Sequence, residues 1–391
     1  YIQATSLMLQ GNNKSALQSF IWLSSNASND LTFHSFVALN QLLLNQLNEA
    51  KKVLPTILKT QNLSGLSEPL YIAAAVELNS GNISNAKELL DEIVIPQEDP
   101  LMLLFQAAID PDKQRLLLRK ASSIMFDFGV LENELTQRQL IQLAEVALFY
   151  RQGLHNNIIA RYSKDEVLAN PYLGVYLSRA HWQLNESDKT LATLNEVVEN
   201  NSKFMSAHLE MASIHYHLKN FEEAITHYEI AVDGSNQNFE LSVQLGNLYN
   251  SASFPEKAQA MYKKLNNDKP SGYLNNQIAA TYATKLNEAE KGLDFALAAI
   301  QMNPENLSYK DTLANIYLQL GEYKKAEMLY LQIMDVTKLN QAPDTFFNIA
   351  KVYDGLGQSD TAQFYYELSL NTGHEFENVK DAEERLKTLF N

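Results

Sequence analysis

A small residue returns at nearly constant spacing along the whole chain, and this period restricts the fold more than any other feature. Of the ten steps between successive members of the series, seven are 34 residues long and three are 36. A fixed period of this length indicates a solenoid, in which each structural unit packs only against its neighbours. We therefore expect the 391 residues to form one continuous array rather than several globular domains. The series is Ala4, Ala38, Ala74, Ala108, Ala144, Ser178, Ala212, Gly246, Ala280, Ala314 and Ala350.

The unit from Leu307 to Asn340 shows how the period is built. Apolar residues recur at helical spacing up to Leu320, and a second amphipathic stretch begins at Tyr323, after Gly321. Glycine ends a helix at low cost because it adopts the left-handed conformation. Each unit is therefore predicted to be a helix–turn–helix hairpin whose small residues lie where the helices approach most closely. Glycine or asparagine occupies the same turn in other units, at Gly11, Asn45, Gly81, Asn185, Asn287 and Gly357.

The spacing of these residues is similar to that of a known repeat family. The unit described above resembles the tetratricopeptide repeat in the run Leu313-Ala314-x-x-Tyr317-x-x-x-Gly321-x-Tyr323-x-x-Ala326-x-x-x-Tyr330. The stretches 211–228, 245–270 and 349–366 match as well, and weaker versions lie near the amino end. The resemblance covers essentially the whole chain as about eleven units. It implies an all-α fold, an α-solenoid that forms a right-handed superhelix of such hairpins.

The regularity of the units changes along the chain. Residues 1–100 form the amino-terminal repeats, 101–170 are degenerate, 171–375 are regular, and 376–391 have the amphipathic pattern of a capping helix. In the degenerate part Pro111 predicts a first helix that ends near Ile109. Lys120, Asn156 and Thr190 stand where the small residue of the second helix is expected. Two interpretations stay open for this part: divergence that the stack tolerates with a change of pitch, or a hinge or docking site. Pro55 predicts a kink or an early helix end.

Composition excludes several classes of function. The chain has no cysteine, so disulfides and thiolate chemistry are absent, and no apolar run approaches the ~20 residues that span a bilayer. The net charge is −15, with 17 acidic and 13 basic groups in residues 1–170 and 29 and 18 in residues 171–391. This surface disfavours nucleic acid and favours a basic or neutral partner. Because the chain opens at Tyr1 inside a helix pattern, we expect a signal peptide, lipid anchor or domain before it.

The sequence carries no constellation of catalytic residues. The metalloprotease motif, the phosphate-binding loop, the nucleophile elbow and the calcium-binding loop are all absent. Four histidines cluster, but His208 and His215 are two helical turns apart, roughly 10 Å, which is too far to share one metal. We therefore predict neither an enzyme nor a metal or cofactor site, and expect these histidines to be hydrogen-bonded. The cluster is His208, His215, His217 and His227.

The resemblance implies that the first helices of the hairpins line a concave groove where ligands bind. Projecting each first helix outward gives the candidate residues for this groove. Asparagine amides offer donors and acceptors to an extended peptide, and aromatic rings offer flat apolar contact area. The candidates are Tyr172, Arg179, Trp182, Tyr216, His217, Asn247 and Asn250 in the central units, and Asp311, Asn315, Lys351 and Asp354 toward the carboxyl end.

The amino-terminal part of the groove is predicted to be apolar instead. A lining of this size would be costly if it were left in water. Three alternatives stay open: it holds a hydrophobic helix, it meets a second copy of the chain, or it turns inward because these units are irregular. The residues concerned are Leu39, Leu42, Leu43, Phe105, Ile109, Ile141, Leu148 and Phe149.

Two functional hypotheses follow from the repeat and its resemblance. The first is a non-catalytic scaffold or adaptor that binds a protein segment in its concave groove. Long arrays of this family resemble periplasmic scaffolds of exopolysaccharide secretion and surface assembly, which implies a bacterial cell-envelope setting. The second is a regulatory or substrate-recruiting segment of a larger enzyme whose catalytic domain lies upstream.

Overall fold

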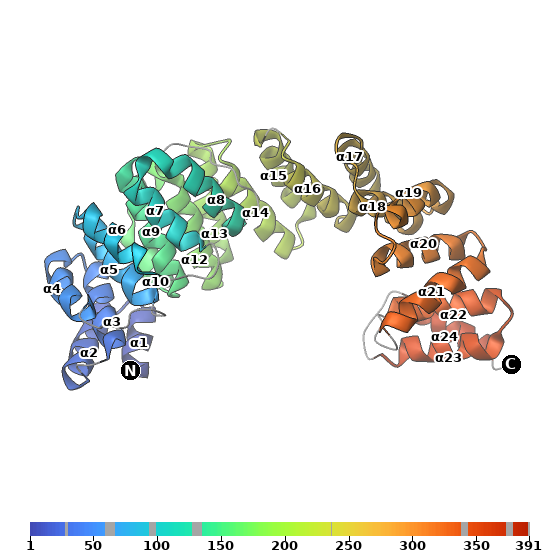
Figure 1. Cartoon of the computed structure of the whole chain (residues 1–391), viewed down its shortest axis with the longest axis horizontal. Coiled ribbons are helices and arrows are strands. Elements are labelled where there is room, and N and C mark those ends of the chain that lie inside the picture. Colours follow the sequence, from blue (N-terminus) through green and yellow to red (C-terminus); the bar gives the residue numbers. More distant parts are fainter. Residues whose placement is uncertain are drawn as a thin grey trace. The chain divides into compact units, whose positions relative to one another are not determined.

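The computed structural model describes residues 1–27, 30–58, 67–93, 99–126, 135–235, 237–337, 343–372 and 378–389, and every regular element in these ranges is helical. The chain divides into two compact units, Tyr1–Asn238 (unit 1) and Phe239–Asn391 (unit 2). Unit 1 runs from blue to yellow-green in Figure 1, and unit 2 from there to red. No helix in the described ranges is long and apolar enough to cross a membrane.

Unit 1 consists of helical hairpins with one additional helix and one 3₁₀ turn (Figure 1). The first helices are α1 (Ile2–Leu9), α3 (Leu31–Leu43), α5 (Ser67–Asn79), α7 (Pro100–Ile109), α9 (Gln137–Arg151), α12 (Pro171–Gln183) and α14 (Met205–His217). The second helices are α2 (Asn13–Asn26), α4 (Leu47–Leu58), α6 (Ile83–Asp91), α8 (Gln114–Phe126), α10 (His155–Arg161), α13 (Ser187–Asn200) and α15 (Phe221–Gly234). The additions are η1 (Pro111–Lys113) and α11 (Lys164–Ala169).

Unit 2 continues the same pattern. Its first helices are α16 (Phe239–Ser251), α18 (Gly272–Thr284), α20 (Leu307–Gln319) and α22 (Pro343–Gly355). Its second helices are α17 (Pro255–Asp268), α19 (Ala289–Met302), α21 (Tyr323–Thr337) and α23 (Ser359–Leu370). The last helix, α24 (Val379–Leu389), packs against α23 and buries Ala382. Across the described residues, the two units together contain the eleven hairpins predicted from the period.

The turns within the hairpins confirm the prediction made from glycine and asparagine. Gly321 has a φ of 75° and Asn185 a φ of 60°, both in the left-handed region. Glycine enters this region without steric cost, and asparagine does so more readily than most other residues. The remaining predicted turn residues also have positive φ: Gly11, Asn45, Gly81, Asn287 and Gly357.

The recurring small residues lie in the contacts between helices. Ala38, Ala74 and Ala314 are fully buried. In α18 the buried small residue is Ala279, one position before the regular series, and a Cβ on Gly292 would lie 3.0 Å from the Ala279 carbonyl oxygen. The helix is therefore one residue out of phase with the regular series, which has Ala280 at this point.

Gly246 marks a close contact of this kind between two helices of unit 2. A Cβ at this position would lie 2.6 Å from Cε1 of the Tyr262 ring, and Tyr262 is fully buried. We expect Gly246→Ala to lower the free energy of unfolding by about 1–3 kcal/mol, because the ring must move within a packed core. Gly234→Ala is the matched control, since nothing lies within 4 Å of its Cβ. Denaturant unfolding measures both, and equal values for the two variants would contradict the packing described.

The two proline predictions have different outcomes. As predicted, α7 ends at Ile109, and Pro111 begins the 3₁₀ turn η1. By contrast, α4 continues through Pro55 to Leu58, so the helix does not end at this proline, and the alternative of a kink there stays a prediction. The expected capping helix over 376–391 is present as α24, while residues 376, 377, 390 and 391 lie outside the described ranges.

The hairpin of α9 and α10 folds back onto the first hairpin of unit 1. The Asn156 side chain donates a hydrogen bond to the Leu9 carbonyl (2.9 Å), and Asn157 donates one to the Met8 carbonyl (2.8 Å). These contacts join residues 147 and 149 positions apart. The amino-terminal hairpins are therefore not a simple linear stack in which each unit contacts only its neighbours.

Candidate functional site

The apolar residues expected to line the amino-terminal groove lie in the core of unit 1. Leu39, Leu42, Phe105, Leu148 and Phe149 are fully buried, and Leu43 is 8% exposed. Ile109 and Ile141 are half-buried and pack against the same core. Of the three alternatives given for these residues, the structure agrees with the one in which the side chains turn inward. An open apolar groove is therefore wrong for the described part of this unit, and the surface expected to meet a second copy is not exposed.

Polar contacts from the end of α9 hold the amino-terminal first helices together. The Arg151 guanidinium pairs with Glu68 and donates to the Asp99 carboxylate (2.7 Å), and it lies 5.1 Å from the centroid of the Tyr71 ring. The Tyr71 hydroxyl donates to the same carboxylate (2.9 Å). Burial acts to raise the pKa of Asp99, but the hydrogen bonds from Arg151 and Tyr71 hold it below its usual range. These contacts join α5, α9 and the start of α7.

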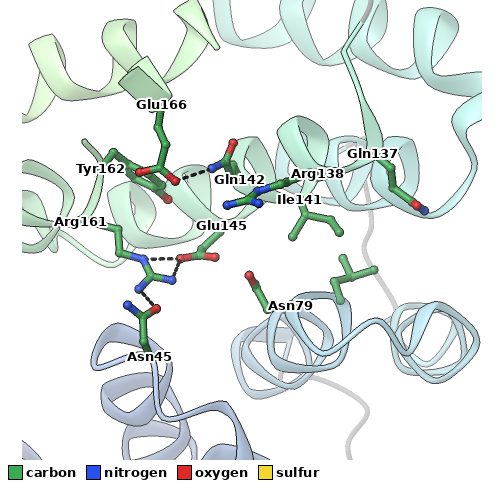
Figure 2. Close-up of a pocket in the computed structure, with 11 residues that line it drawn as sticks. Asn45, Asn79, Gln137, Arg138, Ile141, Gln142, Glu145, Arg161, Tyr162 and Glu166 are labelled. Atoms are coloured by element: carbon green, nitrogen blue, oxygen red, sulfur yellow. Dashed lines mark hydrogen bonds and ion pairs between the residues drawn. The ribbon is translucent and has the colours of Figure 1, made fainter. Parts of the chain in front are cut away.

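A polar cavity of about 580 Å³ lies beside the hairpin of α9 and α10, which folds back onto α1 (Figure 2). Its walls come from α5, α9, the end of α10, α11 and the turn between α3 and α4. The lining side chains are mostly amides, carboxylates and guanidinium groups, with few apolar contacts. The residues are Asn45, Leu78, Asn79, Gln137, Arg138, Ile141, Gln142, Glu145, Arg161, Tyr162 and Glu166.

A buried ion pair forms one wall of the cavity. Arg161 Nε donates to Glu145 Oε1 at 2.9 Å, and a terminal guanidinium nitrogen lies 2.8 Å from the same oxygen. The other terminal nitrogen donates to the Asn45 side chain. Glu145 is 2% exposed, and its burial raises the pKa of the carboxyl group even though Arg161 opposes this shift. The Glu145 carboxylate therefore depends on Arg161 for its charge.

The second carboxylate of the cavity is also fully engaged. Glu166 accepts hydrogen bonds from the Ser163 backbone and hydroxyl (both 3.0 Å), which form the capping box that begins α11. Gln142 Nε2 donates to its other oxygen at 3.0 Å. The Ser163 bonds hold the pKa of Glu166 below its usual range despite partial burial. Within the described ranges, the exposed Arg138 guanidinium makes no hydrogen bond or ion pair.

Two of the predicted groove residues on α12 are engaged within unit 1. Tyr172 is 5% exposed, and its ring packs edge-on against Phe204 with centroids 4.9 Å apart. Its assignment to an open groove wall is therefore wrong, because the ring belongs to the core. The Arg179 guanidinium donates two hydrogen bonds to Glu210 (2.9 and 2.7 Å) and lies 5.9 Å from the Tyr176 ring centroid.

The structure brings together three other predicted residues of unit 1. The rings of Trp182 and His217 have centroids 6.2 Å apart, and those of Tyr216 and His217 are 6.3 Å apart. Tyr216 is 44% exposed, His217 is exposed and Trp182 is half-buried. We call these three residues the aromatic patch. It lies at the carboxyl ends of α12 and α14.

In unit 2 the two predicted asparagines of α16 bond to the neighbouring helices. Asn247 Oδ1 accepts hydrogen bonds from the hydroxyls of Tyr262 (2.6 Å) and Tyr273 (3.1 Å). Asn250 Nδ2 donates to Thr281 Oγ1 at 3.0 Å. Both residues are half-buried, and the Asn250 side-chain oxygen is buried.

The remaining predicted residues of unit 2 lie on α20 and α22. Burial, and secondly the charge of Asp344, raises the pKa of Asp311 to about 6. The Asn315 side chain accepts from Gln319, and Lys351 is exposed with its ammonium 5.6 Å from the Phe347 ring centroid. Asp354 accepts two hydrogen bonds from Arg385 of the capping helix (2.5 and 2.6 Å), so it is engaged within unit 2.

The clustered histidines pack against one another between α14 and α15. His208 Nδ1 lies 2.9 Å from His227 Nδ1, and His208 Nε2 lies 3.0 Å from the Ser202 carbonyl. The rings of His215 and His227 stack with centroids 5.7 Å apart. This confirms hydrogen bonding for His208 and His227, whereas His217 belongs to the aromatic patch. In the ranges described above, no group of three or more histidine or acidic side chains is placed to hold a metal ion.

Sequence reasoning missed the cavity. Its walls come from five segments of unit 1, and its arginines and carboxylates follow no motif of fixed spacing. The one local signal is Asn156, which replaces the small residue expected in α10 and bonds to α1 instead. Such a replacement indicates that α10 packs against a different helix at this point, but the sequence alone does not identify that helix.

Comparisons with known proteins identify the repeat. Family models described as tetratricopeptide repeat match residues 177–239, 311–343 and 343–371. No curated protein sequence matches the chain. Among solved structures, PilW, a widely conserved type IV pilus biogenesis factor, is 17% identical, and the match covers 56% of this chain and 97% of PilW with a TM-score of 0.43.

Two further solved structures show comparable similarity. The Pseudomonas aeruginosa protein pilF is 14% identical over 57% of this chain and 98% of its own, with a TM-score of 0.42. Yeast Tom70 is 12% identical over 99% of this chain and 94% of its own, with a TM-score of 0.40. The family matches fall on hairpins whose period, turn residues and small-residue contacts recur throughout the described residues. Residues 177–239 and 311–371 of the chain are tetratricopeptide repeats.

Proposed function

We propose that this protein is a non-catalytic scaffold that binds a segment of another protein, and that the aromatic patch is one of its contact surfaces. Tetratricopeptide repeats are in general protein–protein interaction scaffolds, and repeat arrays present extended binding surfaces. The observation that carries the proposal is the exposure of Tyr216 beside His217 and Trp182. Tyrosine and tryptophan are enriched among residues that dominate binding energies, because they bury a large area at low entropic cost.

The partner segment that we propose is basic or neutral. Residues 171–391 carry 29 acidic and 18 basic groups, which favours encounter with a positively charged segment. In unit 2, the half-buried Asn247 and Asn250 lie on α16, and we propose that the Asn247 amide nitrogen bonds to an extended backbone. Asp311, Asn315 and the exposed Lys351 add polar contacts on the following first helices. The bacterial cell-envelope setting stays part of this proposal, and fractionation of the source cells with an antibody to the chain tests it.

A double variant tests the aromatic patch. The whole chain is used as bait in chemical cross-linking and pull-down, and the partner so identified is titrated against the purified chain. Trp182→Ala/Tyr216→Ala is expected to weaken binding at least about tenfold, since each ring is of the type that costs more than about 1 kcal/mol when truncated. Trp22→Ala/Phe364→Ala is the matched control, because these rings are 65% and 51% exposed outside the patch.

Two results would count against this assignment. Equal affinity of the patch variant and the wild-type chain would place the partner elsewhere on the protein. Turnover of a substrate by the isolated chain would overturn the non-catalytic role. Asn247→Ala, measured separately, reports whether α16 contributes to the same interaction.

A further inference from the structure

We propose that the polar cavity of unit 1 binds a small, uncharged ligand rich in hydroxyl groups, of the saccharide class. This site is separate from the aromatic patch and does not depend on the proposed scaffold function. Its volume of about 580 Å³ falls within the ~300–1,000 Å³ typical of small-molecule sites. Such sites are usually mostly apolar, so the polar lining in Figure 2 restricts the ligand that can enter.

The charges of the cavity favour a ligand without net charge. Two guanidinium groups, Arg138 and Arg161, share the walls with two carboxylates, Glu145 and Glu166. An anion would lie close to both carboxylates, and a cation would lie close to both guanidinium groups. Both carboxylates already have hydrogen-bond donors, so neither requires a cation from the ligand.

The unused hydrogen-bonding groups include both donors and acceptors. Gln137 Nε2 donates to the Ala108 carbonyl and Gln142 Nε2 to Glu166, which leaves the two amide oxygens as acceptors. Asn45 Oδ1 accepts from Arg161, which leaves its amide nitrogen as a donor. Within the described ranges the Arg138 guanidinium makes no hydrogen bond, so its N–H groups are further donors. Figure 2 shows this side chain between Gln142 and Ile141.

Hydroxyl groups satisfy such a mixture because each one both donates and accepts. An apolar ligand would cover these polar groups without replacing their hydrogen bonds to water, so it would be disfavoured. The planar fork of Arg138 can serve two neighbouring hydroxyl oxygens, as a flexible ammonium group cannot. Leu78 and Ile141 supply the small apolar area on which the C–H face of a sugar ring can rest.

Ligand-observed NMR with the whole chain tests the proposal. The neutral probes are D-glucose, D-mannose and N-acetyl-D-glucosamine, and the charged fragments are acetate and methylammonium. We expect saturation by at least one neutral sugar at millimolar concentration and no comparable saturation by either ion. Arg138→Ala is expected to weaken sugar binding at least fivefold. Arg119→Ala, an exposed arginine of α8 outside the cavity, is expected to leave the affinity unchanged.

A second variant tests whether the sugar binds inside the cavity. Ile141→Trp places an indole in the cavity and is expected to abolish sugar binding, while its helical circular dichroism stays that of the wild type. Saturation by acetate or methylammonium in place of the sugars, or by none of the probes, would overturn the proposal. Unchanged sugar affinity in both Arg138→Ala and Ile141→Trp would also overturn it, because the sugar would then bind outside the cavity.

Discussion

Replacing Arg161 by methionine is expected to lower the free energy of unfolding of unit 1 by about 3–5 kcal/mol. The substitution removes the partner of Glu145, whose side chain is only 3% exposed, and leaves a carboxylate uncompensated in the protein interior. Because burial already raises the pKa of Glu145, the carboxyl group of the variant can take up a proton as the pH falls. The loss of unfolding free energy caused by Arg161→Met should therefore become smaller as the pH is lowered. Denaturant unfolding at several pH values measures both effects.

Two further variants isolate the ion pair. Arg161→Met/Glu145→Leu removes both charges and should recover much of the lost stability, since apolar replacements of buried pairs are often tolerated. Lys52→Ala removes an exposed partner of Glu49 and should cost less than about 1 kcal/mol, as is usual for surface pairs. If Arg161→Met costs no more than Lys52→Ala, Glu145 is not held in the interior as described.

Acidification is expected to destabilise unit 1 through His227. Burial, followed by the neighbouring His208 and His215, lowers the pKa of His227 to about 4, while Glu223 opposes the shift. In the unfolded chain the same imidazole takes up its proton near pH 6.5, so below that value the unfolded state binds more protons than the folded state. The neutral histidine therefore contributes stability that is complete above about pH 6.5 and is lost as the pH falls toward 4. Between about pH 7 and 4.5 this loss is about 2–3 kcal/mol.

Comparison with His227→Gln isolates this contribution from that of the acidic groups. The variant lacks a titrating group at this position, so its unfolding free energy should fall less steeply over the same pH range. His217→Gln, on the exposed end of α14, is the matched control and should keep the steeper wild-type profile. Identical slopes for the wild type and His227→Gln would show that the stacked imidazoles do not carry the effect.

Local sequence features predicted the hairpins because their causes are local. A turn that requires a left-handed residue, such as Gly321, shows itself in the residue type, and Pro111 ends α7 through its own ring. The phase of Ala279 in α18 could likewise be read from the apolar pattern of one helix. These features need no knowledge of distant contacts, so the residues of a single hairpin suffice to predict them.

The features that escaped prediction depend on contacts between distant residues. Outward projection from the helix axis placed Tyr172 in the groove, but the ring packs against Phe204. Burial of Leu39 and Phe149 follows from the fold-back of α9 and α10, which no pattern within one hairpin encodes. The cavity needs side chains from α5, α9 and α11 at once, and their positions relative to one another come only from the folded structure.

The fold-back gives the amino-terminal hairpins a collective behaviour that a linear array lacks. In a linear array the end unit can fray alone, because it is held by one neighbour. Here Asn157 bonds to the Met8 carbonyl across 149 positions, so loosening of α1 also exposes part of the fifth hairpin. The contact forms only after a long span of chain has been brought together, which slows folding and couples the hairpins that it encloses. The amino-terminal segment should consequently melt in a single cooperative step.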